Sequence, residues 1–224
     1  MEECGGYNEL TVAQVAPIFE RVTGVREAGF SETVTGWWVR PKAHGTFQIL
    51  HFLRNQRGVD YRFRWGIALP WVPRLSRGKL RWHRTLKAAE FDLWDQAHDY
   101  LIRTDTPWQE ADVYFPDRSL GPTCFEQDLT ACWNRIDRAI NTWWDDGSDP
   151  AGVLRRADEQ VQRSWEGARH APDPALVSAF ALARMGRLPE AITRLEGASY
   201  SAESSPMLRA GLEEVARTSS VSKT

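Results

Sequence analysis

Three polar residues in one segment come closest to a catalytic constellation. Asp95, His98 and Asp99 fall within an expected helix over residues 88–102, on which Asp95 and His98 share a face at a separation of three. A carboxylate bonded to an imidazole can orient a general base, and neighbouring carboxylates can hold Mg²⁺ in nucleases and phosphohydrolases. The alternative is a solvated polar face with a local ion pair. We favour that alternative because no second acidic motif accompanies the cluster.

The other residues capable of chemistry lack a recognisable spacing. The five histidines form no pair typical of a metal site, and Cys4, Cys124 and Cys132 have no Cys-x-x-Cys spacing. The sequence has no glycine loop for phosphate, no dinucleotide fingerprint and no Gly-x-Ser-x-Gly. We therefore expect no cofactor and no bound metal, and a binding protein is favoured over an enzyme.

Charge is arranged in two opposed blocks behind a formal net charge of −2. Residues 54–87 carry ten basic residues and one acid, about +9, whereas residues 88–117 carry eight acids and one base, about −7. Arginine beside tryptophan is typical of protein interface hot spots and of single-strand nucleic-acid grooves. The predicted partner-binding residues are Arg62, Arg64, Trp71, Arg74, Arg77, Arg81 and Trp82.

Two interpretations of the basic block stay open. It can pair internally with the acidic block, in exposed ion pairs that each contribute little to stability. It can instead bind an acidic protein or a nucleic acid, and a protein partner is favoured because the whole chain is not basic. The enzymatic alternative is a metal-dependent hydrolase or nuclease acting on a phosphate-bearing substrate, with the Asp95 cluster as its site.

The periodicity of apolar residues predicts an α+β fold. Thr11 and Gln14 form a capping box before a helical pattern, and residues 61–69 alternate with a period of two. We expect an antiparallel sheet of about four to five strands packed against helices, with Arg62 and Arg64 on its solvent face. The expected elements are a helix over 12–24, strands over 30–40, 47–53, 61–69 and 79–84, a helix over 88–102, a strand over 112–116, and a helix over 123–144.

A change of composition at residues 145–150 predicts a domain boundary. Ten of the eleven tryptophans precede it, and alanine becomes frequent after it. We expect an α+β domain over 1–146, a small all-α hairpin segment over 150–218 and a frayed tail over 219–224. No N-terminal apolar run and no stretch of about 18 apolar residues is present, which predicts a cytoplasmic protein without a membrane contact.

The order of these elements carries a resemblance. A helix, Gly29-Phe30, a strand pair, an aromatic strand ending in Gly66-Ile67-Ala68-Leu69 and a late helix ending in Trp143-Trp144-Asp145 follow one another. Over about residues 10–146 this order resembles the bacterial family known only as domain of unknown function 4304. Because that family has no established activity, the resemblance implies an α+β fold and no functional residues.

Residues 179–192 resemble the turn between the paired helices of a tetratricopeptide repeat. Small residues fill the first helix, Gly186 stands at the turn, and Glu190-Ala191 opens the second helix. One copy cannot bury its apolar face alone, so we expect it to pack on the preceding domain or on a partner. The sequence as a whole favours a bacterial protein that neutralises or regulates a partner protein, as an immunity or accessory protein of a toxin or defence system does. Its oligomeric state is left open.

Overall fold

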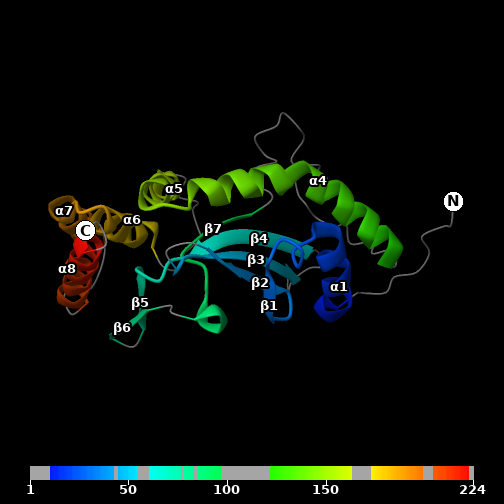
Figure 1. Cartoon of the computed structure of the whole chain (residues 1–224), viewed down its shortest axis with the longest axis horizontal. Helices are drawn as coiled ribbons and strands as arrows, with labels where there is room; N and C mark the ends of the chain where they lie inside the picture. Colours follow the sequence, from blue (N-terminus) through cyan, green and yellow to red (C-terminus); the bar gives the residue numbers. More distant parts are fainter. Residues whose placement is uncertain are drawn as a thin grey trace. The chain divides into compact units, whose positions relative to one another are not determined.

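The structure of the chain, a computed structural model, describes residues 11–42, 45–54, 61–76, 78–82, 85–96, 122–162, 173–198 and 204–221 (Figure 1). It divides into two compact units. Unit 1 comprises Met1–Pro41, Gln48–Gly66 and Trp94–Trp143, and unit 2 comprises Lys42–Phe47, Ile67–Leu93 and Trp144–Thr224.

The helices of the described residues are α1 (Val12–Thr23), the short 3-10 helix η2 (Leu86–Ala88), α4 (Pro122–Asp146), α5 (Pro150–Gln162), α6 (Pro174–Arg184), α7 (Leu188–Glu196) and α8 (Ser205–Val221). The strands are β1 (Ser31–Val34), β2 (Trp37–Pro41), β3 (Phe47–Arg54), β4 (Tyr61–Ala68), β5 (Pro73–Ser76), β6 (Lys79–Trp82) and β7 (Leu93–Gln96).

The predicted α+β class is confirmed. Five strands form one antiparallel sheet in the order β1-β2-β3-β4-β7, and β5 and β6 form a separate two-stranded sheet. The predicted helix at the start of the chain is α1, which begins with the expected capping box. The amide of Gln14 donates to the Thr11 hydroxyl, and the amide of Thr11 donates to the Gln14 side chain over 2.8 Å.

The single strand expected over residues 30–40 is wrong, because a tight turn divides it into the hairpin β1-β2. Gly36 in this turn has φ +79°, a left-handed conformation that glycine adopts without strain. Its carbonyl accepts a hydrogen bond of 2.7 Å from the amide of Phe52 in β3. The turn is therefore fastened to the centre of the sheet, and a side chain at this position would collide with the β3 backbone.

The helix expected over residues 88–102 is also wrong. The described part of this segment contains the end of η2 and the strand β7, which pairs with β4. Burial in β7 alternates, with Leu93 and Asp95 buried and Trp94 and Gln96 half-buried, as in a strand. The strand expected over 79–84 exists as β6, but it pairs with β5, which the sequence did not predict. The strand expected over 112–116 lies outside the described residues.

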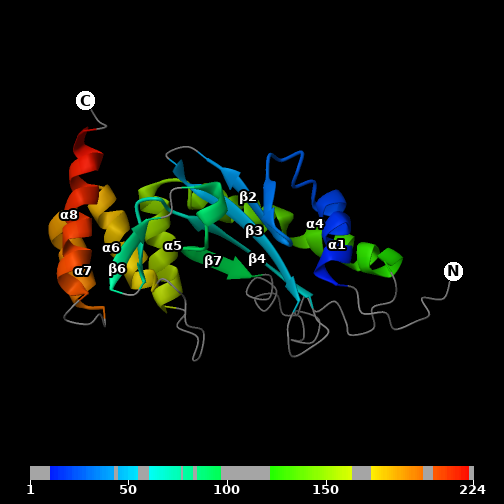
Figure 2. The ribbon, with the colours of Figure 1, turned by 90° about the horizontal axis from the view of Figure 1, so that it is seen from below.

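Aromatic packing joins the helices of unit 1 to its strands. The ring of Phe19 on α1 stacks on Trp38 of β2 at 4.6 Å and contacts Phe52 of β3 at 5.1 Å. Phe52 also meets Phe125 of α4 edge to face, at 6.0 Å. The buried stripe of α4 includes Cys132, as its helical spacing predicted. The side of the sheet that carries Trp38 and Phe52 therefore faces helices, and Figure 2 shows β2 and β3 in front of α4.

The helices of unit 2 surround α6. Every residue from Pro174 to Ala183 except Ala175 is buried, and α6 contacts α5, α7 and α8. Asp158 on α5 accepts hydrogen bonds of 2.9 Å from Ser178 on α6 and from Arg194 on α7, which ties three helices together. The chain after residue 150 is helical, as predicted, with four helices in its described part. Gly186, φ +83°, makes the turn between α6 and α7.

The helices of unit 2 also pack on its small sheet. The ring of Trp82 on β6 meets Phe180 of α6 edge to face, at 6.1 Å. A Cβ atom at Gly211 of α8 would lie 3.2 Å from Leu80 of β6 and 3.3 Å from Phe180. Glycine here lets α8 approach both neighbours closely, and the helices thereby cover one side of the β5-β6 hairpin.

No helix among the described residues is both long enough and apolar enough to cross a membrane.

Replacing Gly36 by alanine is expected to lower the free energy of unfolding by about 3 kcal/mol or more. The new Cβ atom would lie 2.5 Å from the carbonyl oxygen of Phe52, in addition to the strain of a positive φ. Gly78→Ala is the matched control, because Gly78 has φ +70° and nothing within 4 Å of its Cβ position. It should lose only about 1 kcal/mol. Urea denaturation measures both changes, and equal losses would contradict the proposed collision.

Candidate functional site

A row of aromatic and basic side chains crosses four neighbouring strands of unit 1. It starts on β2 and β3, where the ring of Trp37 lies 4.2 Å from the imidazole of His51. It continues on β4 and β7, where the guanidinium carbon of Arg64 lies 4.5 Å from the centre of the Trp94 ring. β3 and β4 are neighbours in the sheet, and His51 on β3 is close enough to feel the positive charge of Arg64 on β4. The two pairs of side chains therefore lie next to each other. All four side chains are half-buried.

Strand alternation explains why these four residues come together. Trp37 precedes Trp38 and His51 precedes Phe52, and neighbouring residues in a strand point to opposite faces. Since Trp38 and Phe52 pack against Phe19 in the core, Trp37 and His51 point to the other face. We name this set of Trp37, His51, Arg64 and Trp94 the aromatic-arginine row.

The row confirms one part of the sequence-based expectation and adds to it. Arg64 lies on the sheet face that the core does not occupy, as predicted, and the side chain of Arg62 lies outside the described part. Trp37, His51 and Trp94 were not among the residues predicted from the sequence. His51 could have been noticed as a single titratable residue within an apolar strand. Trp94 could not, because its segment was predicted to be a helix and not the strand β7.

Burial and charge keep the imidazole of His51 neutral. Burial of the ring, and then the charge of Arg64, lowers the pKa of His51 from 6.5 to about 4. At neutral pH the row therefore presents a single positive charge, on Arg64, between two tryptophans. The guanidinium stacks on the indole of Trp94, a contact worth about 0.5–2 kcal/mol that also fixes its orientation.

The predicted catalytic cluster does not have the geometry on which it was based. Asp95 lies in strand β7, buried to 2% exposure, and its carboxylate accepts a 3.0 Å hydrogen bond from the amide of Gln96. Strand spacing removes the helical face that Asp95 and His98 were expected to share. His98 and Asp99 lie outside the described residues.

Other chemistry-bearing groups are buried or scattered. Burial raises the pKa of the Cys132 thiol to about 12, so this thiol stays protonated and unreactive at neutral pH. In the described ranges, no three side chains among histidine, cysteine, aspartate and glutamate gather where they could hold a metal ion.

Arg74, predicted to bind a partner, is engaged inside unit 2. Its guanidinium forms an ion pair with Glu90 and donates to the carbonyl of Phe91, and its Nε lies 3.9 Å from Oδ1 of Asp92. Glu90 and Asp92 belong to the acidic block, so internal pairing of the two blocks occurs at Arg74. Register in the hairpin places Arg74 opposite Arg81, and these acids compensate the repulsion between the two like charges.

Asp92 is a buried acid with a strongly raised pKa. Burial raises its pKa from 3.8 to about 8, while the amide of Leu69, which donates to Oδ2 over 2.6 Å, and the charge of Arg74 oppose the rise. Burial prevails because Arg74 lies beyond hydrogen-bond distance and is already bound to Glu90 and Phe91. Asp92 therefore acts as a neutral acceptor that fixes Leu69 after β4.

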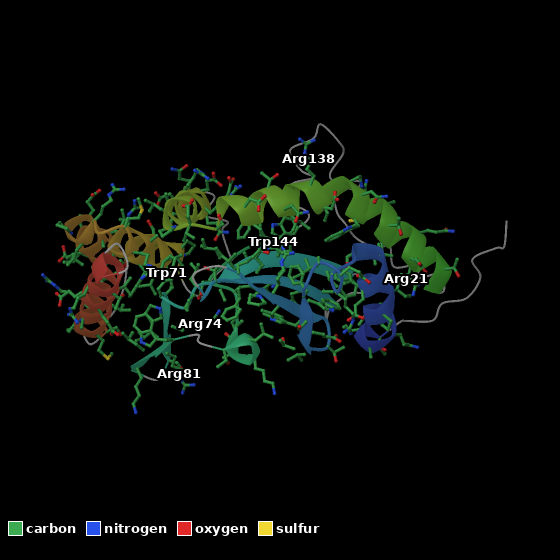
Figure 3. All side chains as sticks on the ribbon, in the orientation of Figure 1. Arg21, Trp71, Arg74, Arg81, Arg138 and Trp144 are labelled. Carbon is green, nitrogen blue, oxygen red and sulfur yellow. The ribbon has the colours of Figure 1, made fainter. Side chains whose placement is uncertain are left out.

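The remaining predicted residues lie around the β5-β6 hairpin. Trp71 is 8% exposed and Trp82 is half-buried, and both line a pocket of about 380 Å³ in unit 2. Arg81 is exposed on β6, and Arg77 lies outside the described residues. Figure 3 labels Trp71, Arg74 and Arg81 along this part of unit 2. The predicted set thus separates into Arg62 and Arg64 on β4 of unit 1 and a second group in unit 2.

Lowering the pH from about 6.5 to 4 is expected to destabilise the fold through His51. In this window the unfolded chain binds a proton at His51 and the folded chain does not. The free energy of unfolding therefore decreases as the pH is lowered, by up to about 3 kcal/mol. His51→Gln removes this contribution. Urea denaturation of both proteins across the window measures the difference, and parallel pH profiles would refute it.

Asp92 should give the opposite pH dependence. Its folded pKa is raised, so the stabilisation is complete below about pH 4 and is lost as the pH rises towards 8. Asp92→Asn keeps an acceptor for the Leu69 amide without a charge, and it should become more stable relative to the wild type as the pH rises. Thermal unfolding between pH 5 and pH 8 checks this, and a constant difference would contradict it.

Comparison with known proteins gives no relative from which a role could be carried over. No protein-family model, no curated protein and no solved structure matches the chain. The resemblances to domain of unknown function 4304 and to a tetratricopeptide repeat therefore stay sequence-based hypotheses.

Proposed function

We propose that this chain is a cytoplasmic, non-enzymatic binding protein that holds a protein partner on the sheet face of unit 1. The observation that supports this proposal is the aromatic-arginine row, in which Arg64 is stacked on Trp94 beside Trp37 and His51. Tryptophan and arginine are the residues most enriched in the energetic centres of protein interfaces. An immunity or accessory protein of a toxin or defence system is the role that fits best.

The row suits a partner that offers a carboxylate next to an apolar group. The guanidinium of Arg64 can bind a carboxylate through two parallel hydrogen bonds, while the two indoles supply large apolar contact areas. Because Arg64 is already oriented by the Trp94 ring, little side-chain entropy is lost when the partner binds. A second positive charge is avoided, since His51 stays neutral.

The other predicted residues contribute unequally to this proposal. Arg74 is engaged by Glu90 and Phe91 and serves the fold of unit 2. Arg81 is exposed on β6 of unit 2 and does not belong to the aromatic-arginine row. The interaction is expected to rest mainly on Arg64.

Two alternatives carry less support. The hypothesis of a metal-dependent hydrolase required Asp95 and His98 to share one face of a helix, and Asp95 lies in the strand β7 instead. A nucleic acid could also stack on tryptophans beside an arginine, but the formal charge of −2 gives little general attraction for phosphates. We retain nucleic-acid binding as an outcome of the experiment below.

The experiment isolates the partner from the native host with the tagged full-length chain, and then measures its affinity for purified variants. Arg64→Ala should weaken binding at least about tenfold, as expected for a central interface arginine. Arg64→Lys should recover only part of the loss, because a lysine does not reproduce the planar stacking and paired hydrogen bonds.

Arg138→Ala is the control, since Arg138 is an exposed arginine on α4 (Figure 3), and it should bind like the wild type. Thermal unfolding verifies that all variants fold. Failure to recover any stoichiometric protein at low and at moderate salt would refute the proposal, and so would unchanged affinity in Arg64→Ala. Recovery of nucleic acid with affinity that falls steeply as salt rises would favour the alternative.

A further inference from the structure

The pocket of unit 2 has one apolar and one charged wall. Its volume is about 380 Å³, within the range of small-molecule sites, and Phe47, Pro70, Trp71 and Trp82 form the apolar wall. Arg184 of α6 and Glu214 of α8 contribute the charges, and we call these two residues the charged wall. The site is independent of the aromatic-arginine row, none of whose residues lines it.

The apolar wall is held in place by its surroundings. Trp71 is 8% exposed, so most of its ring is fixed by packing. The ring of Trp82 is fixed edge to face on Phe180. Gly45, also at the pocket, has φ +76°, and a Cβ atom there would lie 3.2 Å from Pro70. These contacts hold the two indoles in place, so a planar side chain can lie against them without ordering loose groups.

The charged wall contains one arginine and one glutamate. Arg184 donates a 3.1 Å hydrogen bond to the Ser219 hydroxyl, which itself donates to the carbonyl of Val215 over 2.7 Å. Among the ion pairs of the described residues, neither Arg184 nor Glu214 takes part.

We propose that this pocket binds a free α-amino acid with an aromatic side chain. The ligand carboxylate pairs with Arg184, its ammonium group pairs with Glu214, and its ring lies against Trp71 and Trp82. An α-amino acid carries both charges on one carbon, so a single ligand can face an arginine and a glutamate that line the same pocket. Arginine suits the carboxylate because its fork makes two parallel bonds.

The arrangement discriminates against ligands with a single charge. An amine that lacks a carboxylate makes no ion pair with Arg184. An acid that lacks an amine makes no ion pair with Glu214. Each loss removes a charge-assisted hydrogen bond, which corresponds to about a tenfold loss of affinity or more. Recognition of both ends therefore separates an amino acid from its amine and acid relatives.

Isothermal titration calorimetry on the full chain tests this proposal with L-tryptophan, tryptamine and indole-3-propionic acid. L-Tryptophan should bind one to one, at least about tenfold more tightly than either analogue. Glu214→Gln should remove the preference for L-tryptophan over indole-3-propionic acid but keep the preference over tryptamine. Arg184→Gln should do the reverse. This crossed pattern would not arise from a merely structural effect.

Glu213→Gln is the matched control, because Glu213 is exposed on α8 next to Glu214 and does not line the pocket. It should bind L-tryptophan like the wild type. Thermal unfolding checks that Arg184→Gln still folds after losing its bond to Ser219. The proposal is overturned if L-tryptophan shows no saturable binding up to about 5 mM, or if both analogues bind as tightly as L-tryptophan. Neither result bears on partner binding through Arg64.

Discussion

The alternation of side chains along a strand is the constraint on which both the core and the binding face of unit 1 depend. Trp37 and Trp38 are adjacent in sequence, yet Trp38 stacks on Phe19 in the core while Trp37 lies against His51 on the other face. A shift of β2 by one residue would exchange the two tryptophans. The hydrogen bond from Phe52 to the Gly36 carbonyl opposes such a shift, because it fastens the hairpin turn to β3.

Burial decides what each arginine of the basic block can do. Arg74 is held beside the buried Asp92 and is bound by Glu90, so its charge is used within unit 2. Arg64 lies over the indole of Trp94, on the sheet face that the core of unit 1 does not occupy. A sum of charges over the block treats these two residues as equal. Their surroundings make one a structural residue and the other a candidate for recognition.

The sequence predicted those helices and strands whose formation is determined by residues close together in the chain. The capping box of Thr11 and the alternation around Trp65 gave α1 and β4 close to their observed bounds. The spacing of Phe91 and Trp94 imitates a helix, and only pairing with β4 makes that segment a strand. Candidate sites followed the same rule. Arg64 was found from its strand, but its partner Trp94 comes from a distant segment that no local pattern connects to it.

The path of the chain limits how this protein can be divided. Unit 2 takes Lys42–Phe47 and Ile67–Leu93 from between segments of unit 1, and its helices pack on the hairpin that the second of these segments contains. A cut of the chain near residue 146 would therefore not separate the two units. Loss of α6 and α8 in evolution or by proteolysis would expose the apolar side chains of Leu80 and Trp82. Exposed apolar patches of this kind promote aggregation. Both units are expected to be inherited together.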